Sequence, residues 1–259
     1  MEINFQKYQG TGNDFVMIDC VNQSELVISI PLIQQLCNRR FGIGADGLIC
    51  IYKHDDFDFE MKYYNSDGSR SFCGNGARCA VAFAHSLGLF KKDAHFLAID
   101  GEHHATLNEK QVHLLMADVK SIIKDNDAYV LDTGSPHFVS FVNDLDAVDI
   151  LKYGKEVRYS LAYKEQGINV NLVEKVDTQK LNMLTYERGV EDETFSCGTG
   201  ATAVALAFAI KSNVSDPFEF DIKVKGGRLK VSATPYKEGF KNIYLIGPAT
   251  YVFNGSVSV

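Results

Sequence analysis

Two segments of this 259-residue chain are near copies of each other, and this repeat limits what the chain can fold into. The first reads FCGNGA at 72–77 and the second reads SCGTGA at 196–201, which places Cys73 and Cys197 124 residues apart. Each segment leads into an alanine-rich helical pattern. A spacing near half the chain length indicates an internal duplication and predicts two similar domains.

The elements around the two segments define the expected fold class. Twelve strand-like segments run from Phe15–Asp19 to Asn242–Ile246, bounded by turn residues. Helical patterns are expected at Ile30–Arg40, Gly74–Leu87, Leu145–Tyr153 and Gly198–Lys211. The last pattern is apolar on every side, which is typical of a helix buried all round. We therefore predict an α+β fold of two similar domains, each a mixed sheet rolled around a buried central helix, with the active site in the cleft between them.

The repeat also predicts where the two domains divide. We expect the first domain, which carries Cys73, to span residues 1–117 and to include a C-terminal strand at about 250–259 that pairs back onto it. The second domain, which carries Cys197, is expected at residues 118–249.

Composition excludes several classes of partner. The net charge is −7 and the basic residues form no cluster, so nucleic acid is not an expected partner. No apolar run approaches about 18 residues, so no membrane span is expected. The first residues lack a basic start followed by an apolar run, so we expect a cytoplasmic location.

Cofactor and metal signals are weak. The run GIGADG at 42–47 fits a dinucleotide-binding pattern, but a helix precedes it and a strand follows it, the reverse of what that motif needs. His103 and His104 lack further ligands at metal-binding spacing. We predict no cofactor and no metal. Four of the six cysteines are expected to be buried, unreactive thiols: Cys20, Cys37, Cys50 and Cys79.

Cys73 and Cys197 differ because each directly precedes a helix. The positive end of a helix dipole favours a thiolate. The neighbouring glycines leave the backbone N–H groups of the first turn open to a ligand. Two such helix starts could hold one carboxylate with a thiol at each side. This arrangement suits a racemase, in which one base removes an α-proton and an acid on the opposite face returns one.

At these residues the chain resembles the diaminopimelate epimerase family along nearly its whole length. The matching segments are GTGNDF at 10–15, RRFGIGADG at 39–47, YNSDGS at 64–69, CGNGAR at 73–78, GSPH at 134–137, Asn169, YERG at 186–189 and CGTGA at 197–201. The resemblance implies cofactor-independent interconversion of LL- and meso-diaminopimelate, in lysine and peptidoglycan biosynthesis. It also implies a homodimer.

The resemblance implies a role for each site residue. In the direction that makes the meso form, Cys197 accepts a proton and Cys73 donates one. His137 and Glu187 adjust the pKa values of the two thiols. The reacting carboxylate is held by Gly74, Asn75, Gly198 and Thr199. The remaining substrate contacts come from Asn13, Asn65, Asn169, Glu187 and Arg188. These types suit a distal end that carries an ammonium and a carboxylate, since Arg can bind the carboxylate through two hydrogen bonds and Glu can bind the ammonium.

Two positions depart from the family pattern. Many members have Asn where this chain has Ser135, so we leave Ser135 out of the expected substrate-binding set. Some members have Gln where this chain has Gly47, so a side-chain contact at that position is missing.

Two other functions fit part of the pattern. A proline or hydroxyproline racemase on the same fold has less need for Asn65, Asn169 and Arg188, because its substrate lacks a second amino-acid end. A non-catalytic redox sensor would use Cys73 and Cys197 as a disulfide pair.

Overall fold

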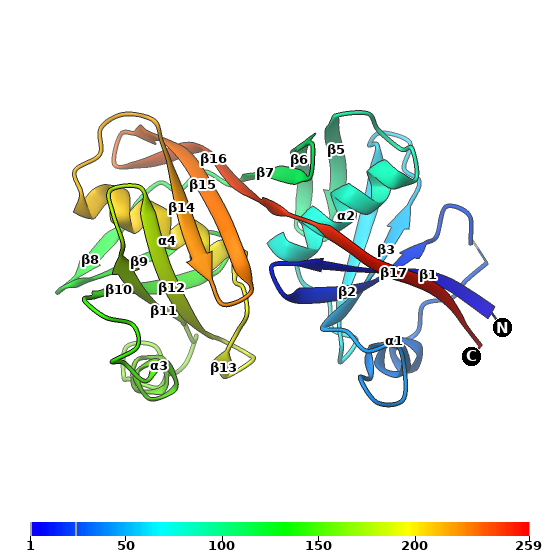
Figure 1. The fold of residues 1–259 in the computed structure, drawn as a ribbon, viewed down its shortest axis with the longest axis horizontal. Coiled ribbons are helices and arrows are strands. Elements are labelled where there is room, and N and C mark those ends of the chain that lie inside the picture. The colour runs from blue at the N-terminus through cyan, green and yellow to red at the C-terminus, as the bar shows by residue number, and fades with distance from the viewer. Residues whose placement is uncertain (1, 24, 259) are drawn as a thin grey trace. The chain divides into compact units, whose positions relative to one another are not determined.

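The computed structural model describes residues 2–23 and 25–258, and the chain divides into two compact units (Figure 1). The first unit comprises Met1–Leu114 and Gly247–Val259, and the second comprises Leu115–Ile246. The expected domain bounds, residues 1–117 with about 250–259 and residues 118–249, stay a prediction.

The described residues of the first unit form a mixed sheet and two helices. Its elements are β1 (Glu2–Gly10), β2 (Asn13–Asp19), α1 (Ile30–Cys37), β3 (Gly47–Tyr52), β4 (Phe59–Asn65), α2 (Gly74–Ser86), β5 (Asp93–Ala98), β6 (Gly101–Asn108), β7 (Gln111–Met116) and β17 (Thr250–Ser258). The strands pair in the order β17-β1-β2-β3-β4-β5-β6-β7, and only the pairs β2–β3 and β4–β5 are parallel in this part of the described chain.

The second unit repeats this plan. Its elements are β8 (Ile123–Asp125), β9 (Ala128–Asp132), β10 (Pro136–Val142), α3 (Ile150–Arg158), β11 (Asn169–Lys175), β12 (Lys180–Glu187), β13 (Asp192–Glu193), α4 (Gly198–Lys211), β14 (Phe218–Val224), β15 (Gly227–Tyr236) and β16 (Gly239–Pro248). Its main sheet runs β8-β9-β10-β11-β12-β14-β15-β16, with β10–β11 and β12–β14 parallel. Strand for strand, the sequence of parallel and antiparallel pairs matches that of the first unit. The expected α+β fold from an internal duplication is confirmed.

A central helix lies inside the sheet of each unit (Figure 1). The helix α2 contacts β1, β2, β3, β4 and β6, and α4 contacts β9, β10, β11, β12, β14 and β15. Strands across the whole sheet can touch one helix only if the sheet curves around it. In α4 every residue from Gly200 to Ala209 is buried, as its apolar pattern predicts. The many alanines let the surrounding strands approach closely.

The two outer helices differ from expectation at their ends. We expected α1 to reach Arg40, but it ends at Cys37 because the extended backbone of Asn38 stops it, and the Asn38 side chain accepts from the N–H groups of Arg40 and Phe41. We expected the third helix at 145–153, but α3 begins at Ile150. The Asp149 carboxylate caps it by accepting from Leu151 N and Lys152 N.

The expected strand list is incomplete at the N-terminus. The first expected strand begins at Phe15, yet β1 covers Glu2–Gly10 and pairs with both β2 and β17. Its polar residues hid the pattern. Lys7 is among them, and it is buried against the carboxylate of Asp14 at 2.7 Å. No helix among the described residues is long and apolar enough to cross a bilayer.

The enclosure of α4 predicts a steep difference in the effect of truncation along the helix. Leu206 is fully buried, whereas Ile210, one turn later, is 43% exposed. We expect Leu206→Ala to lower the free energy of unfolding by about 2–5 kcal/mol because it leaves a cavity. The matched Ile210→Ala should stay within about 0.5 kcal/mol. Urea unfolding followed by circular dichroism measures both, and equal losses would contradict the enclosure.

Candidate active site

The two central helices begin with the same geometry. Cys73 is the N-cap of α2 with φ −136° and ψ 114°, and its Sγ accepts from Gly76 N at 3.5 Å. Cys197 is the N-cap of α4 with φ −122° and ψ 110°, and its Sγ accepts from Gly200 N at 3.4 Å. In each unit a sulfur atom therefore takes the capping position that Ser, Thr or Asp usually occupies.

In the first unit the amide of Asn13 faces Cys73. Asn13 Nδ2 donates to Asp46 Oδ2 at 2.7 Å, and since a carboxylate only accepts, this contact sets the orientation of the amide. Asn13 Oδ1 then accepts from Cys73 Sγ at 3.6 Å and from Asn75 Nδ2 at 3.2 Å. A hydrogen-bond acceptor beside the sulfur favours its protonated form.

An ion-pair cluster holds Asn13 in place. Arg39 bridges Asp14 and Asp46 with contacts of 2.7 Å each, and Lys7 binds Asp14 and the Gly44 carbonyl. Burial alone would raise the pKa of Asp14, but the hydrogen bonds from Arg39 and Lys7 outweigh it and lower that pKa to about 2. The two sequence segments at 10–15 and 39–47 therefore act together as one support for Asn13.

A buried cation lies beside the first turn of α2. Arg78 is fully buried, and its guanidinium donates to the Gly74 carbonyl, to Thr11 Oγ1 and to Asn75 Oδ1. These acceptors are all neutral, and the buried Nε has no partner among the described residues. The positive charge is therefore left to favour an anion at the start of α2.

Gly47 makes room for the side chain that holds Asn65. A Cβ at position 47 would lie 2.4 Å from Tyr63 Cε2, so this aromatic ring fills the space. The Tyr63 hydroxyl donates to Asn65 Oδ1 at 2.9 Å. Asn65 Nδ2 donates within its own turn to Ser69 and Ser71. The missing side chain at position 47 is thus matched by a nearby tyrosine.

In the second unit His137 lies between two polar side chains. Its Nε2 is 2.9 Å from Thr199 Oγ1, and its Nδ1 is 3.1 Å from Asn171 Nδ2. Complete burial, together with the charge of Arg188, lowers the pKa of His137 to about 3. The imidazole is therefore neutral near pH 7. Thr199 Oγ1 lies 3.5 Å from Cys197 Sγ, so a hydroxyl stands between the ring and the sulfur.

Asn169, Arg188 and Ser135 form a second polar group in this unit. Asn169 Nδ2 donates to Ser135 Oγ at 2.8 Å, and Asn169 Oδ1 accepts from Arg188 N at 2.9 Å. The Arg188 guanidinium donates to the Gln166 carbonyl and, at 3.4 Å, to Ser135 Oγ. Ser135 was not in the expected substrate-binding set, yet it contacts Asn169 and Arg188, which were.

Glu187 is the last residue of β12, and the turn that follows it carries Arg188. The carboxylate of Glu191 anchors this turn, since it accepts from the hydroxyls of Tyr159 and Tyr186 at 3.0 Å each and from Gly189 N at 3.1 Å. The turn is therefore held in shape within the unit itself.

The other four cysteines are buried free thiols, as expected. Burial raises the pKa of Cys79 to about 12 and the pKa of Cys37 to about 11, which makes both unreactive near neutral pH.

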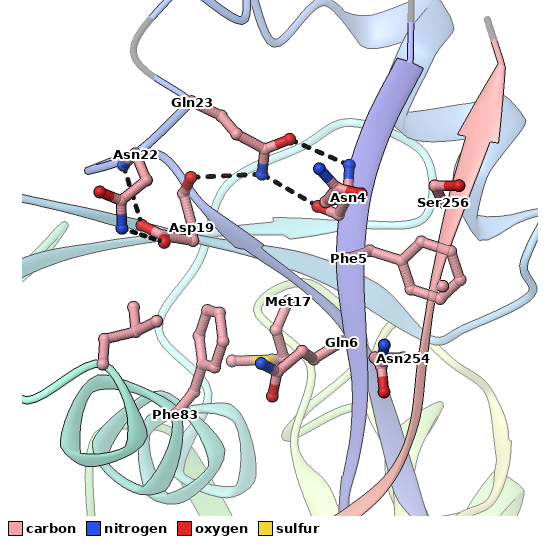
Figure 2. Close-up of a pocket in the computed structure, with 12 residues that line it drawn as sticks. Asn4, Phe5, Gln6, Met17, Asp19, Asn22, Gln23, Phe83, Asn254 and Ser256 are labelled. Carbon is pink, nitrogen blue, oxygen red and sulfur yellow. Dashed lines mark hydrogen bonds between the residues drawn. The ribbon is translucent and has the colours of Figure 1, made fainter.

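Figure 2 shows a groove in the first unit, lined by β1, β2, α2 and β17, that includes none of the expected site residues. Gln23 bonds both backbone groups of Asn4, at 2.9 and 3.0 Å, and Asn22 donates to Asp19. These side chains tie the segment after β2 to its sheet, so the groove has a structural explanation.

Sequence reasoning missed Asn171, Ser135 and Arg78 as members of the two polar clusters. One signal was available for Asn171. It lies two residues after Asn169 in a strand, and residues at i and i+2 share one face of a sheet.

The fold and the two clusters define a class of protein: a duplicated α+β chain in which each half contributes one helix-capping thiol and its own polar surroundings. A family profile described as diaminopimelate epimerase matches residues 5–126 and 129–252. A diaminopimelate epimerase from Flavobacterium psychrophilum is 48% identical over 97% of this chain and 98% of its own length. One from Chlorobaculum tepidum is 37% identical over 96% of this chain and 99% of its own length.

This chain belongs to the diaminopimelate epimerase family. A solved structure of a PhzF-family phenazine biosynthesis protein from Bacillus anthracis matches with a TM-score of 0.79 and 15% identity, covering all of both chains. At that identity the likeness shows a shared fold and nothing more.

The burial of neutral His137 predicts a stability change with pH. Its folded-state pKa of about 3 lies below the ordinary value of 6.5, so the unfolded chain binds the proton more readily. This contribution is fully present above about pH 6.5 and is lost as the pH falls toward 3. We expect a loss of about 2 kcal/mol in unfolding free energy between about pH 7 and pH 5. In His137→Gln the loss of unfolding free energy between about pH 7 and pH 5 should be smaller by that amount. Urea unfolding at both pH values measures it, and the same loss in both proteins would contradict the prediction.

Proposed function

We propose that this protein converts LL-diaminopimelate to meso-diaminopimelate without a cofactor, with Cys197 as the base and Cys73 as the acid. Each sulfur accepts from one N–H group of its own helix. The observation that supports this direction is the difference in the second contact of each sulfur. Cys73 Sγ lies beside the acceptor Asn13 Oδ1, which favours a thiol. Cys197 Sγ lies beside Gly200 N–H and the Thr199 hydroxyl, which can both donate to a thiolate.

The proposed reaction moves one proton in and one proton out. The Cys197 thiolate removes the α-proton, and the electron pair of the C–H bond spreads onto the α-carboxylate. The S–H of Cys73 then breaks as its proton bonds to the opposite face of the α-carbon. Cys197 ends as a thiol and Cys73 as a thiolate, and exchange with solvent resets both. The proposal requires both helix starts to reach the same substrate.

The start of each helix supplies the electrostatic part of this mechanism. Four backbone N–H groups at a helix start lack partners within the helix, and they can donate to a carboxylate. We propose that Gly74-Asn75 and Gly198-Thr199 bind the reacting carboxylate in this way. The charge that builds on it in the transition state is then met by fixed dipoles and by buried Arg78.

We propose that the remaining residues select a substrate with a second amino-acid end. In this proposal Arg188 binds the distal carboxylate, and its contacts with Ser135 and the Gln166 carbonyl support the role because they order the guanidinium. Asn65, Asn169 and Glu187 complete the set by binding the ammonium and carboxylate groups. A proline-type racemase would leave this cluster without a ligand.

Deuterium exchange tests the assignment. In deuterated water, LL-diaminopimelate should yield meso product with deuterium at one α-carbon, detected by NMR and chiral chromatography. Cys73→Ser and Cys197→Ser should each lower turnover by about 10²- to 10⁴-fold, because each removes one acid–base group. Cys73→Ser should still exchange deuterium slowly into the LL substrate with retention, since Cys197 remains. Cys197→Ser should exchange deuterium with retention only into meso-diaminopimelate, since Cys73 remains.

A matched control and two comparison assays make this test specific. Cys37→Ala also removes a thiol, but one that is buried in α1, and it should keep wild-type turnover. Exchange into proline rather than diaminopimelate would favour the racemase alternative. Wild-type turnover in either serine variant would contradict the two-thiol mechanism. A protein with no exchange but a reversible Cys73–Cys197 disulfide would favour the redox sensor.

We also propose, from the family resemblance, that the protein is a homodimer. The cytoplasmic location and the lack of a nucleic-acid or membrane partner stay predictions from the sequence. Sedimentation equilibrium should give twice the chain mass of 28.8 kDa. A mass of one chain at assay concentrations would contradict the dimer.

A further inference from the structure

The orientation of one buried side chain, Asn171, determines how the hydrogen bonds around Cys197 run. Asn171 is fully buried in β11, and its Nδ2 donates to the Phe138 carbonyl at 3.2 Å. A carbonyl can only accept, so the NH₂ group faces Phe138. The Thr185 hydroxyl donates to Asn171 Oδ1 at 3.0 Å, which agrees with that orientation.

This orientation dictates the tautomer of His137. The NH₂ group of Asn171 also lies 3.1 Å from His137 Nδ1, so Nδ1 must accept and carries no proton. In a neutral imidazole the proton is then on Nε2. His137 is neutral at the pH of catalysis, since burial and the charge of Arg188 lower its pKa to about 3. Its Nε2–H therefore donates to Thr199 Oγ1 at 2.9 Å.

The tautomer in turn directs the hydroxyl proton of Thr199. Because Thr199 Oγ1 accepts from His137, its own proton can be donated elsewhere, and Cys197 Sγ lies 3.5 Å away. The opposite tautomer would take the hydroxyl proton toward Nε2 and leave the oxygen lone pairs facing the sulfur. One arrangement stabilises a thiolate and the other repels it.

We propose that Asn171 is a positioning residue that fixes the Nε2–H tautomer of His137, so that the Thr199 hydroxyl donates to the Cys197 thiolate. The inference rests on the proposed function for its catalytic meaning. The local packing supports it, because a Cβ at Gly200 would lie only 2.7 Å from Asn171 Oδ1. The glycine at the start of α4 thus leaves the space that Asn171 occupies.

Nitrogen NMR of the protein with labelled histidine tests the tautomer directly. In the wild type, His137 Nδ1 should give an unprotonated signal and Nε2 a protonated one. In Asn171→Asp, a carboxylate replaces the NH₂ donor, and the proton should move to Nδ1. In Asn171→Leu, which removes both polar groups, the preference should be lost. A wild-type protein with the proton on Nδ1 would overturn the inference without any variant.

Kinetics then separate positioning from a general loss of structure. Asn171→Asp should lower kcat by roughly 10- to 100-fold, which corresponds to one hydrogen bond to a charged group, with KM nearly unchanged. The acid limb of the kcat/KM profile should move to higher pH. The double variant Asn171→Asp/Thr199→Val should be no slower than Thr199→Val, because both act through one hydroxyl. If the losses in kcat of the two single variants added in the double variant, the inference would be overturned.

A control and a separate readout keep this test apart from that of the proposed function. Asn182→Asp makes the same chemical change on β12 and should leave the tautomer, kcat and pH profile unchanged. The pH dependence of Cys197 alkylation by iodoacetamide, measured in Cys73→Ser protein without substrate, should shift to higher pH in Asn171→Asp. If epimerase activity were absent but this shift remained, the positioning role would stand while the proposed function failed. An unshifted alkylation profile would overturn the inference.

Discussion

The structure depends on how a buried helix satisfies the N–H groups of its first turn. A helix enclosed by its own sheet exposes these groups at one end only, and there they need partners. In both units a cysteine sulfur accepts one of them, and the glycines Gly76 and Gly200 leave room for packed neighbours. The same feature explains the alanine-rich helix, the curved sheet around it and the reactivity expected of the thiol. We expect a larger side chain in the first turn to block the carboxylate binding that we propose there.

The duplication gives two helix starts with the same backbone geometry, and different polar side chains surround them. In α2 the Gly74 carbonyl accepts from the buried guanidinium of Arg78, whereas in α4 the equivalent Gly198 carbonyl accepts from the hydroxyl of Thr202. The sulfurs differ in the same way, since Cys73 Sγ also lies beside the amide oxygen of Asn13 and Cys197 Sγ lies beside the hydroxyl of Thr199. A reversible two-base reaction needs such a pair, in which one sulfur starts protonated and the other does not. We propose that the local contacts of each half set the protonation state of its own thiol.

Features that depend on neighbouring residues in the sequence could be predicted, whereas features that depend on contacts between distant residues could not. The bounds of α4 were predicted to the residue, since its apolar run and the residues that flank it define them locally. The strand β1 was missed because Lys7 is buried through contacts with Asp14 and the Gly44 carbonyl, which both lie outside that strand. The start of α3 was wrong by five residues because its apolar pattern begins before Asp149, the residue whose side chain caps the helix. Side-chain networks such as the one around Asn171 were beyond sequence reasoning, because they need the register of β10 against β11.

The two departures from the family pattern show how such networks compensate for a changed residue. Ser135 is shorter than asparagine, and its hydroxyl accepts from Asn169 and from Arg188. Because a hydroxyl has two acceptor lone pairs, it can hold both donors at once. At Gly47 the ring of Tyr63 fills the space that a side chain would occupy, and its hydroxyl donates to Asn65. In both cases a lost side chain is replaced by a contact that orders an expected substrate-binding residue before any ligand arrives. Ordering of this kind reduces the entropy that a side chain loses when it binds a ligand, so we expect the proposed substrate contacts to be preorganised at both positions.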